Sequence, residues 1–267
     1  MRKPLISHAL EKTLDRPEPL MLEKHIGQVI KASEAIISQK ALNFKGLTEE
    51  QIKEISILIA ACHDFGKSTV FFQDYIWSKI DGYPYTGDER DKSHSLISGL
   101  FGWHLLEKWL AKNSEIEEHW KSFLPLAVLI AIEGHHGYYA SIDEILKKVA
   151  DGIQNDLFNR QLRHIREEIF TYKFNGFHLK QGADFNLEVI KRIWKELRKI
   201  HRGYKKGSLD EQIEQRILGL LLYSVLLEAD KAYLASDTPE QYEREPISIP
   251  EDIVDKYIER AIIKSSV

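Results

Sequence analysis

The chain has 267 residues, a formal net charge of −4 and a charged fraction of 29%. Its length allows a sizeable core, and its weak negative charge excludes a surface coated in basic charge, so any contact with nucleic acid must come from a local patch. The single cysteine, Cys62, excludes an internal disulfide and suits a reducing compartment. The N-terminus lacks a signal-peptide core, and no apolar run is long enough to span a bilayer. We therefore expect a cytoplasmic protein.

Apolar residues recur at helical spacing along most of the chain. In chain order, the pattern predicts helices over residues 19–42, 48–63, 93–110, 115–135, 142–155, 184–201, 209–235 and 250–264. Gly66 follows the second of these closely, as a helix stop often does. Three helix starts match a capping box, in which a Ser or Thr precedes a Glu or Gln by three residues: Thr48 with Gln51, Ser141 with Glu144, and Ser208 with Glu211.

Strand signals are weak by comparison. Residues 170–179 contain Asn175-Gly176 between apolar residues, which favours a short β-hairpin. The chain shows no internal repeat and no Pro/Gly/Ser-rich linker; residues 82–91 read as a polar loop and residues 202–207 as a basic one. We expect one all-α domain over residues 1–267, with at most a short hairpin.

The central chemical signal is the pair His63-Asp64 at the end of an apolar helix. An imidazole and a carboxylate on adjacent residues can bind one metal ion together, and the second carboxylate oxygen can bridge to another ion. Gly66-Lys67 extends the pair to the pattern HDxGK, which is far more specific than the dipeptide.

Five more residues complete the candidate set of metal ligands. His135 and His136 follow an apolar stretch, His94 lies at a helix start, and His25 lies beside the apolar stripe of the first long helix. At about 100° per residue, Asp230 lies at the edge of the apolar face of its helix, where a carboxylate needs a cation or strong hydrogen-bond donors.

Together these residues resemble the HD phosphohydrolase superfamily in its extended two-metal form, His…His-Asp…His…His-His…Asp. More narrowly, the chain resembles the HD nuclease of the Cas-three nuclease–helicases of type I CRISPR interference, over about residues 20–236. The elements that carry this resemblance are His25 in Leu-Glu-Lys-His, His63-Asp64-Phe65-Gly66-Lys67, Ser93-His94-Ser95, His135-His136-Gly137 and Ala229-Asp230-Lys231-Ala232.

The resemblance implies a single HD-type helical domain and an assignment of ligands. It places His25, His63, Asp64 and Asp230 on one metal ion and His94, His135 and His136 on the other, with Asp64 bridging. Imidazole-rich sites favour transition ions such as Mn, Fe, Co, Ni or Zn over Mg. Two such ions about 3.5–4 Å apart can activate a water for attack on a phosphodiester. The catalytic residues would be Asp64 and Lys67, whose charge can stabilise the scissile phosphate.

The implied activity is metal-dependent cleavage of single-stranded DNA, independent of ATP. Since no helicase follows in the chain, the resemblance implies a stand-alone nuclease subunit that works with a separate helicase and an RNA-guided surveillance complex. Basic residues in and near the loop at 202–207 could contact the strand: Arg202, Lys205 and Lys206.

Three alternatives remain open. The first is an HD-type hydrolase of nucleotides or small phosphoesters, and the second is a non-catalytic HD-fold binding module. The third is a P-loop NTPase, because residues 61–68 loosely match that motif. Against it, Asp64 would stand where phosphates need backbone N–H groups, and the chain lacks alternating strands and helices.

Overall fold

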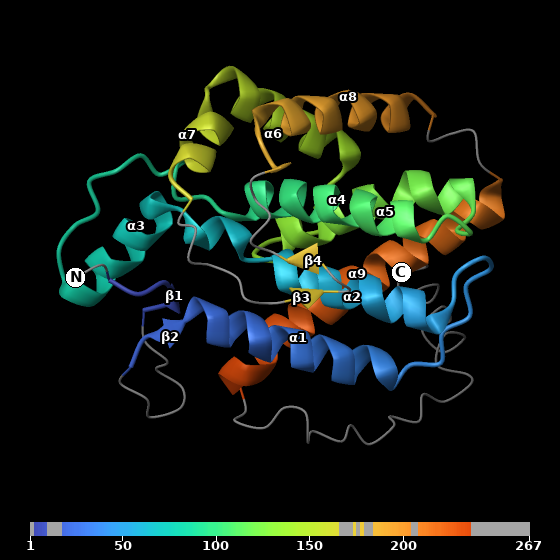
Figure 1. Ribbon diagram of the computed structural model, residues 1–267, viewed down its shortest axis with the longest axis horizontal. Coiled ribbons are helices and arrows are strands. Elements are labelled where there is room, and N and C mark those ends of the chain that lie inside the picture. The colour runs from blue at the N-terminus through green and yellow to red at the C-terminus, as the bar shows by residue number, and fades with distance from the viewer. Residues whose placement is uncertain are drawn as a thin grey trace, which may run out of the picture.

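The computed structural model of the protein describes residues 3–9, 18–165, 173–174, 177–178, 184–203 and 208–235 (Figure 1). Within them lie nine α-helices: α1 (Leu22–Ser38), α2 (Glu49–Cys62), α3 (Val70–Asp81), α4 (Ser95–Lys112), α5 (Glu118–Gly134), α6 (Ile142–Gln154), α7 (Leu157–Arg163), α8 (Leu187–Gly203) and α9 (Leu209–Ala235). A 3₁₀ helix, η1 (Phe65–Ser68), follows α2. The prediction of an all-α fold is confirmed.

The described residues also form two antiparallel pairs of short strands. Strand β1 (Ile6–His8) pairs with β2 (Leu20–Met21), and β3 (Lys173–Phe174) pairs with β4 (Phe177–His178). The second pair is the hairpin that the sequence favours around Asn175-Gly176. The first pair was not predicted, because strands of two or three residues are too short for a period-2 pattern.

The three predicted capping boxes are present. Thr48 Oγ1 accepts the Gln51 N–H at 3.1 Å, while Gln51 Oε1 accepts the Thr48 N–H at 2.9 Å. The same reciprocal bonds join Ser141 with Glu144 and Ser208 with Glu211. Each box satisfies N–H groups that the first helical turn leaves without partners, which sets the starts of α2, α6 and α9.

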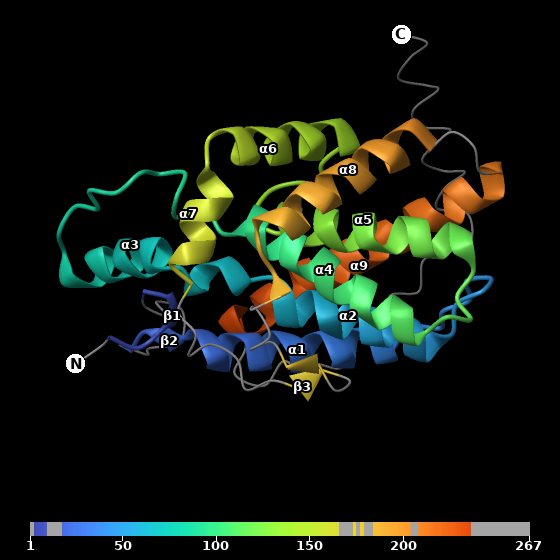
Figure 2. The same ribbon diagram turned by 45° about the horizontal axis from the view of Figure 1, so that its top comes forward.

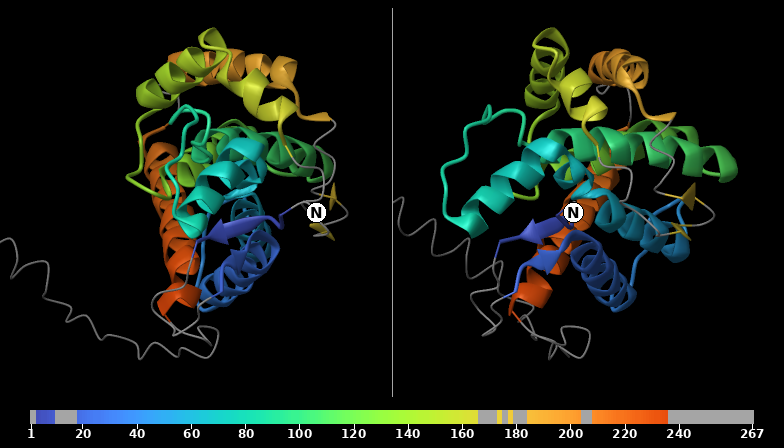
Figure 3. Two further views of the ribbon diagram at one scale, coloured as in Figure 1. Left: turned by 90° about the vertical axis from the view of Figure 1, so that its left-hand side faces the viewer. Right: turned by 60° about the vertical axis from the view of Figure 1, so that its left-hand side comes forward.

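The helices form layers around one main hydrophobic core. Helices α4 and α5 pack along each other through the middle, α1 packs against α2 and α9, and α5 packs against α9 (Figure 2). Helices α6, α7 and α8 cover the other side of α4 and α5, as the end-on views show (Figure 3). Trp103, Trp109 and Trp120 are among the largest fully buried side chains. None of the described helices is both long and apolar enough to cross a membrane.

Several boundaries differ from the predictions. Helix α1 begins at Leu22 rather than residue 19, because Leu20 and Met21 pair with β1. Helices α3 and α7 were not predicted; α3 buries few apolar side chains, chiefly Phe72 and Ile76 against Ile6 of β1, so its periodicity is weak. The predicted helix at 250–264 lies outside the described residues.

Candidate metal centre

The HD pair lies where α2 leaves its helical path inside the core. Helix α2 ends at Cys62, and His63 keeps a helical backbone (φ −55°, ψ −34°). Asp64 then departs from it (φ −109°, ψ 15°). Both side chains are fully buried. Because a buried carboxylate or imidazole is costly without partners, this end of α2 requires polar groups from neighbouring elements.

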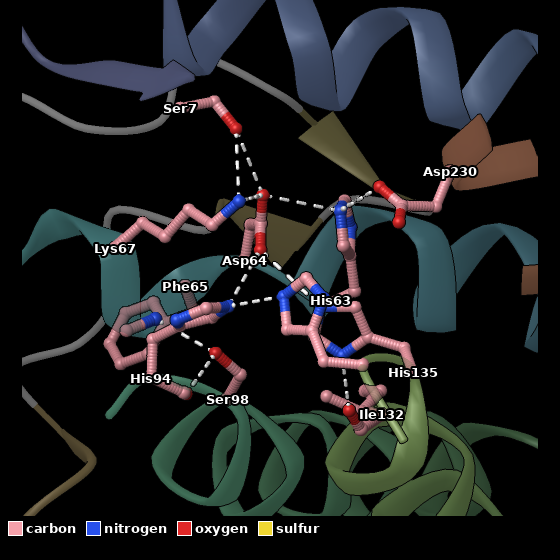
Figure 4. A network of polar contacts seen from close by, with 12 residues as sticks. Ser7, His63, Asp64, Phe65, Lys67, His94, Ser98, Ile132, His135 and Asp230 are labelled. Atoms are coloured by element: carbon pink, nitrogen blue, oxygen red, sulfur yellow. Dashed lines mark hydrogen bonds and ion pairs between the residues drawn. The ribbon is translucent and has the colours of Figure 1, made fainter. Parts of the chain in front are cut away.

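Those groups come from four other helices and their ends (Figure 4). His25 projects from α1 and Asp230 from α9, and both are buried. His94 is the residue that precedes α4, and His135 directly follows α5. Segments far apart in the sequence therefore meet at one point. There they form two arrays, each of which could hold a metal ion. The first array consists of His25, His63 and Asp230, and the second of Asp64, His94, His135 and His136.

The first array gathers around one oxygen of Asp64. Asp64 Oδ2 lies 3.3 Å from His25 Nε2 and 3.3 Å from His63 Nε2. Asp230 Oδ1 approaches the same two nitrogens, at 3.2 Å from His25 Nε2 and 3.6 Å from His63 Nε2. Two imidazole nitrogens and two carboxylate oxygens thus converge from three helical elements.

The second array gathers around the other oxygen of the same carboxylate. Asp64 Oδ1 lies 3.3 Å from His94 Nε2 and 3.7 Å from His135 Nε2. His136 Nε2 in turn lies 2.9 Å from His94 Nε2. Asp64 therefore stands between the arrays with one oxygen towards each, which is the arrangement a bridging ligand needs.

Backbone carbonyls orient two of the imidazoles. His63 Nδ1 lies 2.7 Å from the Ala60 carbonyl oxygen, and His135 Nδ1 lies 2.5 Å from the Ile132 carbonyl oxygen. A proton on Nδ1 leaves the Nε2 lone pair of each ring directed into the site, as in many metal-binding histidines. Asp64 Oδ1 and His135 Nε2 are buried yet make no hydrogen bond of good geometry among the described residues. These donors fit a divalent cation.

The charge states also suit metal binding. Burial would raise the pKa of Asp64, but the charges of His63 and Lys67 hold it well below its usual range. Burial lowers the pKa of His94 to about 4, and burial with the neighbouring His135 lowers that of His136 to about 2. The carboxylate is therefore ionised and these two imidazoles are neutral, which are the ligand forms of both groups.

The first array attracts positive charge strongly. Burial lowers the pKa of His63, but the carboxylates of Asp64 and Asp230 outweigh it and raise the value to about 10. For Asp230, burial favours the neutral acid, yet hydrogen bonds from His25 and His63 bring its pKa far below the ordinary value. A metal ion that binds between these carboxylates would displace this proton and free His63 Nε2 to act as a ligand.

Lys67 lies inside the site and not at the surface. Its side chain is buried, and Nζ is 2.8 Å from Asp64 Oδ2. Nζ also donates to Ser7 Oγ at 3.2 Å, and Ser7 Oγ donates to Asp64 Oδ2 at 3.1 Å. Asp64 Oδ2 thus has the Lys67 ammonium group and the Ser7 hydroxyl beside it in addition to the imidazoles.

Sequence reasoning missed Ser7 and His8 of β1. The His8 ring stands edge-on to the His25 ring with centroids 4.9 Å apart, and its Nδ1 is buried without a hydrogen-bond partner among the described residues. The only signal was a Ser-His pair near the N-terminus, which has no metal-ligand spacing to the other candidates.

Gly66 has a different role from the predicted helix stop. Its φ is not in the left-handed region, and it lies in η1. An added Cβ would lie 2.5 Å from the His94 carbonyl oxygen, so the glycine allows η1 and the start of α4 to touch. Since Gly66 and Lys67 follow a helix and no parallel sheet occurs in the described residues, the structure contradicts the P-loop alternative.

Of the three predicted nucleic-acid contacts, the structure describes Arg202, which does not lie at this centre. Arg202 is exposed near the C-terminal end of α8, which lies at the opposite end of the molecule from β1 in Figures 1 and 2. Lys205 and Lys206 lie outside the described residues. Their role stays a prediction.

Comparison with known proteins agrees with the motif pattern. Residues 17–221 match the family model described as Cas3, HD domain. The CRISPR-associated nuclease/helicase Cas3 of Haloferax volcanii is 27% identical over 172 residues, a match that covers 62% of this chain and 17% of the relative. The chain thus corresponds to a small part of that protein's length. No solved structure matches the chain.

Proposed function

The chain belongs to the family of Cas3 HD domains, and we propose that it is a metal-dependent nuclease that cleaves single-stranded DNA in CRISPR interference. The observation that carries this proposal is the carboxylate of Asp64, whose two oxygens face two separate arrays of imidazole and carboxylate ligands. We infer that it bridges two metal ions.

The geometry supports one ligand set for each ion. His25, His63 and Asp230 with Asp64 Oδ2 would hold one ion, and His94, His135 and His136 with Asp64 Oδ1 the other. The predominance of imidazole favours Mn, Fe, Co, Ni or Zn over Mg. Such a pair of ions would supply an activated water and neutralise charge on a phosphodiester.

The protein's own groups would do three things in this reaction. Asp64 fixes the spacing of the two arrays, because it belongs to both. The carbonyls of Ala60 and Ile132 hold the His63 and His135 rings with Nε2 inward. Lys67, fixed by Ser7, places a positive charge beside the bridging carboxylate, where it can stabilise negative charge that grows on the phosphate.

A single strand suits this centre better than a duplex. Asp64, Lys67 and His135 are buried and His94 has a side-chain exposure of only 12%, so His136 is the one exposed member of the two arrays. A flexible backbone can bend towards a recessed site, whereas a duplex must first be opened. In this proposal a separate helicase opens the duplex and an RNA-guided complex selects the target, so the nuclease itself needs neither ATP nor sequence preference.

The test compares circular single-stranded DNA with free nucleotides. Purified protein is incubated with Mn²⁺, Ni²⁺, Co²⁺ or Mg²⁺ and each substrate, alongside Asp64→Ala and the surface variant Asp143→Ala as a matched control. Nicking of the circle by wild type and Asp143→Ala but not by Asp64→Ala supports the proposal. Efficient nucleotide dephosphorylation with an intact circle would instead establish the small-phosphoester hydrolase.

A further inference from the structure

An exposed aromatic side chain stands next to the second ligand array. The residues that follow α5 are His135, His136, Gly137 and Tyr138, and the Tyr138 side chain is 61% exposed. Tyr138 lies two positions beyond His136, a span of at most about 7 Å of extended chain. A large exposed ring this close to a nuclease centre calls for an explanation, because most aromatic area is buried in folding.

The ring is held in place although it is exposed. Tyr138 Oη donates to Glu144 Oε1 at 2.7 Å, and the other oxygen of Glu144 accepts the Ser141 N–H at 2.8 Å in the capping box of α6. The backbone beneath it is also fixed, because Tyr223 Oη donates to the Gly137 carbonyl oxygen at 3.3 Å. A ring that is already oriented loses little conformational entropy when a ligand covers its face.

A cation and a cavity lie beside this ring. Lys148 Nζ is 6.0 Å from the Tyr138 ring centroid and also forms an ion pair with Glu133. Lys148 and Glu133 line a cavity of about 360 Å³, whose wall includes Ser93 and Ser95 on either side of His94. The cavity therefore extends from Lys148, beside the Tyr138 ring, to the two sequence neighbours of His94.

We propose that Tyr138 is the stacking platform for a nucleobase next to the scissile phosphate, with Lys148 beside the neighbouring backbone. Every base has a flat face that can stack on an aromatic ring, so this contact binds single strands without reading their sequence. It also requires an unpaired base, since a base within a duplex already has neighbours on both faces. The inference rests on the proposed nuclease function and names how that site selects a single strand.

The experiment pairs a change in the protein with a change in the substrate. Cleavage of a thymidine oligonucleotide and of a fully abasic oligonucleotide of equal length is followed under saturating Mn²⁺, with KM and kcat measured for each. The proteins are wild type, Tyr138→Ala, Tyr138→Phe, and Tyr83→Ala as a control at a second exposed tyrosine, which follows the far end of α3. Thermal unfolding and bound metal are measured for each variant.

If Tyr138 stacks on a base, Tyr138→Ala should raise KM for the thymidine strand about tenfold, the order expected for loss of one base–aromatic stack. It should leave KM for the abasic strand, and bound metal, within about twofold of wild type. Tyr138→Phe keeps the ring and should retain most of the binding, and Tyr83→Ala should match wild type.

Equal effects of Tyr138→Ala on both strands, or no effect on either, would overturn the inference while leaving the nuclease intact. Wild-type protein that cuts neither strand but hydrolyses nucleotides would overturn the proposed function itself, and the stacking role with it.

Discussion

Replacing Gly66 with alanine should separate the two ligand arrays. The new Cβ would lie 2.5 Å from the His94 carbonyl oxygen and 2.8 Å from His94 Cα, both of which are backbone atoms. A side-chain tip could turn aside, but the start of α4 cannot. Since ordinary contact begins near 3.4 Å, η1 and α4 must move apart by about 0.9 Å.

That displacement acts on both stability and chemistry. Overpacking of this kind costs about 1–3 kcal/mol of folding free energy. It would also lengthen the bond from the Gly66 N–H to Ser98 Oγ, now 2.8 Å, and the 3.3 Å separation of Asp64 Oδ1 from His94 Nε2. Because a misplacement of about 1 Å can cost roughly 10²-fold in rate, we expect cleavage to fall by about that factor.

Two glycine controls separate these effects. Gly99→Ala would place its Cβ 2.9 Å from the Leu129 carbonyl oxygen, between α4 and α5, so it should destabilise the fold with a much smaller loss of activity. Gly137→Ala adds a Cβ with nothing within 4 Å and should change little. The assays are urea unfolding, bound metal by elemental analysis, and the rate of single-strand cleavage. A Gly66→Ala protein with wild-type rate and metal content would refute the reasoning.

Three further changes test the site and the core. Asp64→Asn should reduce bound metal at both arrays and leave cleavage undetectable, because the one carboxylate belongs to both arrays. Full retention of one ion would contradict the bridging assignment. Lys67→Met should bind metal more tightly, because a cation 2.8 Å from Asp64 Oδ2 is removed. The variant should nevertheless cleave more slowly, and unchanged turnover would exclude Lys67 from catalysis. His104 is buried with neither ring nitrogen hydrogen-bonded among the described residues, and burial lowers its pKa. The unfolded chain therefore binds more protons below about pH 6.5, and stability falls as the pH drops. His104→Leu should lessen that loss, so urea unfolding of the variant should change less between pH 7.5 and pH 5 than that of wild type. An identical pH dependence in the variant would argue against this role.

The chemistry of the site could be predicted from the sequence because it depends on residue types that metals require. All seven candidate ligands lie in the two arrays, from His25 to Asp230. Helical spacing placed each of them at a helix end or on an apolar face, where a polar group needs a partner. That reasoning succeeds for long helices, because their period and their caps are local properties of the chain.

The contributions of β1 could not be predicted in this way. Ser7 and His8 reach the metal centre only because Ile6–His8 pairs with Leu20–Met21 and packs against α3. A strand of three residues has no measurable period, and its position depends on contacts with residues more than a dozen positions away. The burial of Lys67 has the same origin, since Ser7 and Asp64 together satisfy its ammonium group.

The sequence by itself determined the helical class, the helix caps and the set of candidate metal ligands, because each depends on short-range patterns or on intrinsic chemistry. Only the tertiary structure decided that Asp64 directs one oxygen to each array, that Gly66 permits η1 to touch α4, and that Tyr138 stays exposed beside His136. These facts depend on the relative placement of helices, which is set by long-range packing, and no local pattern encodes a distance between segments that are far apart in the chain.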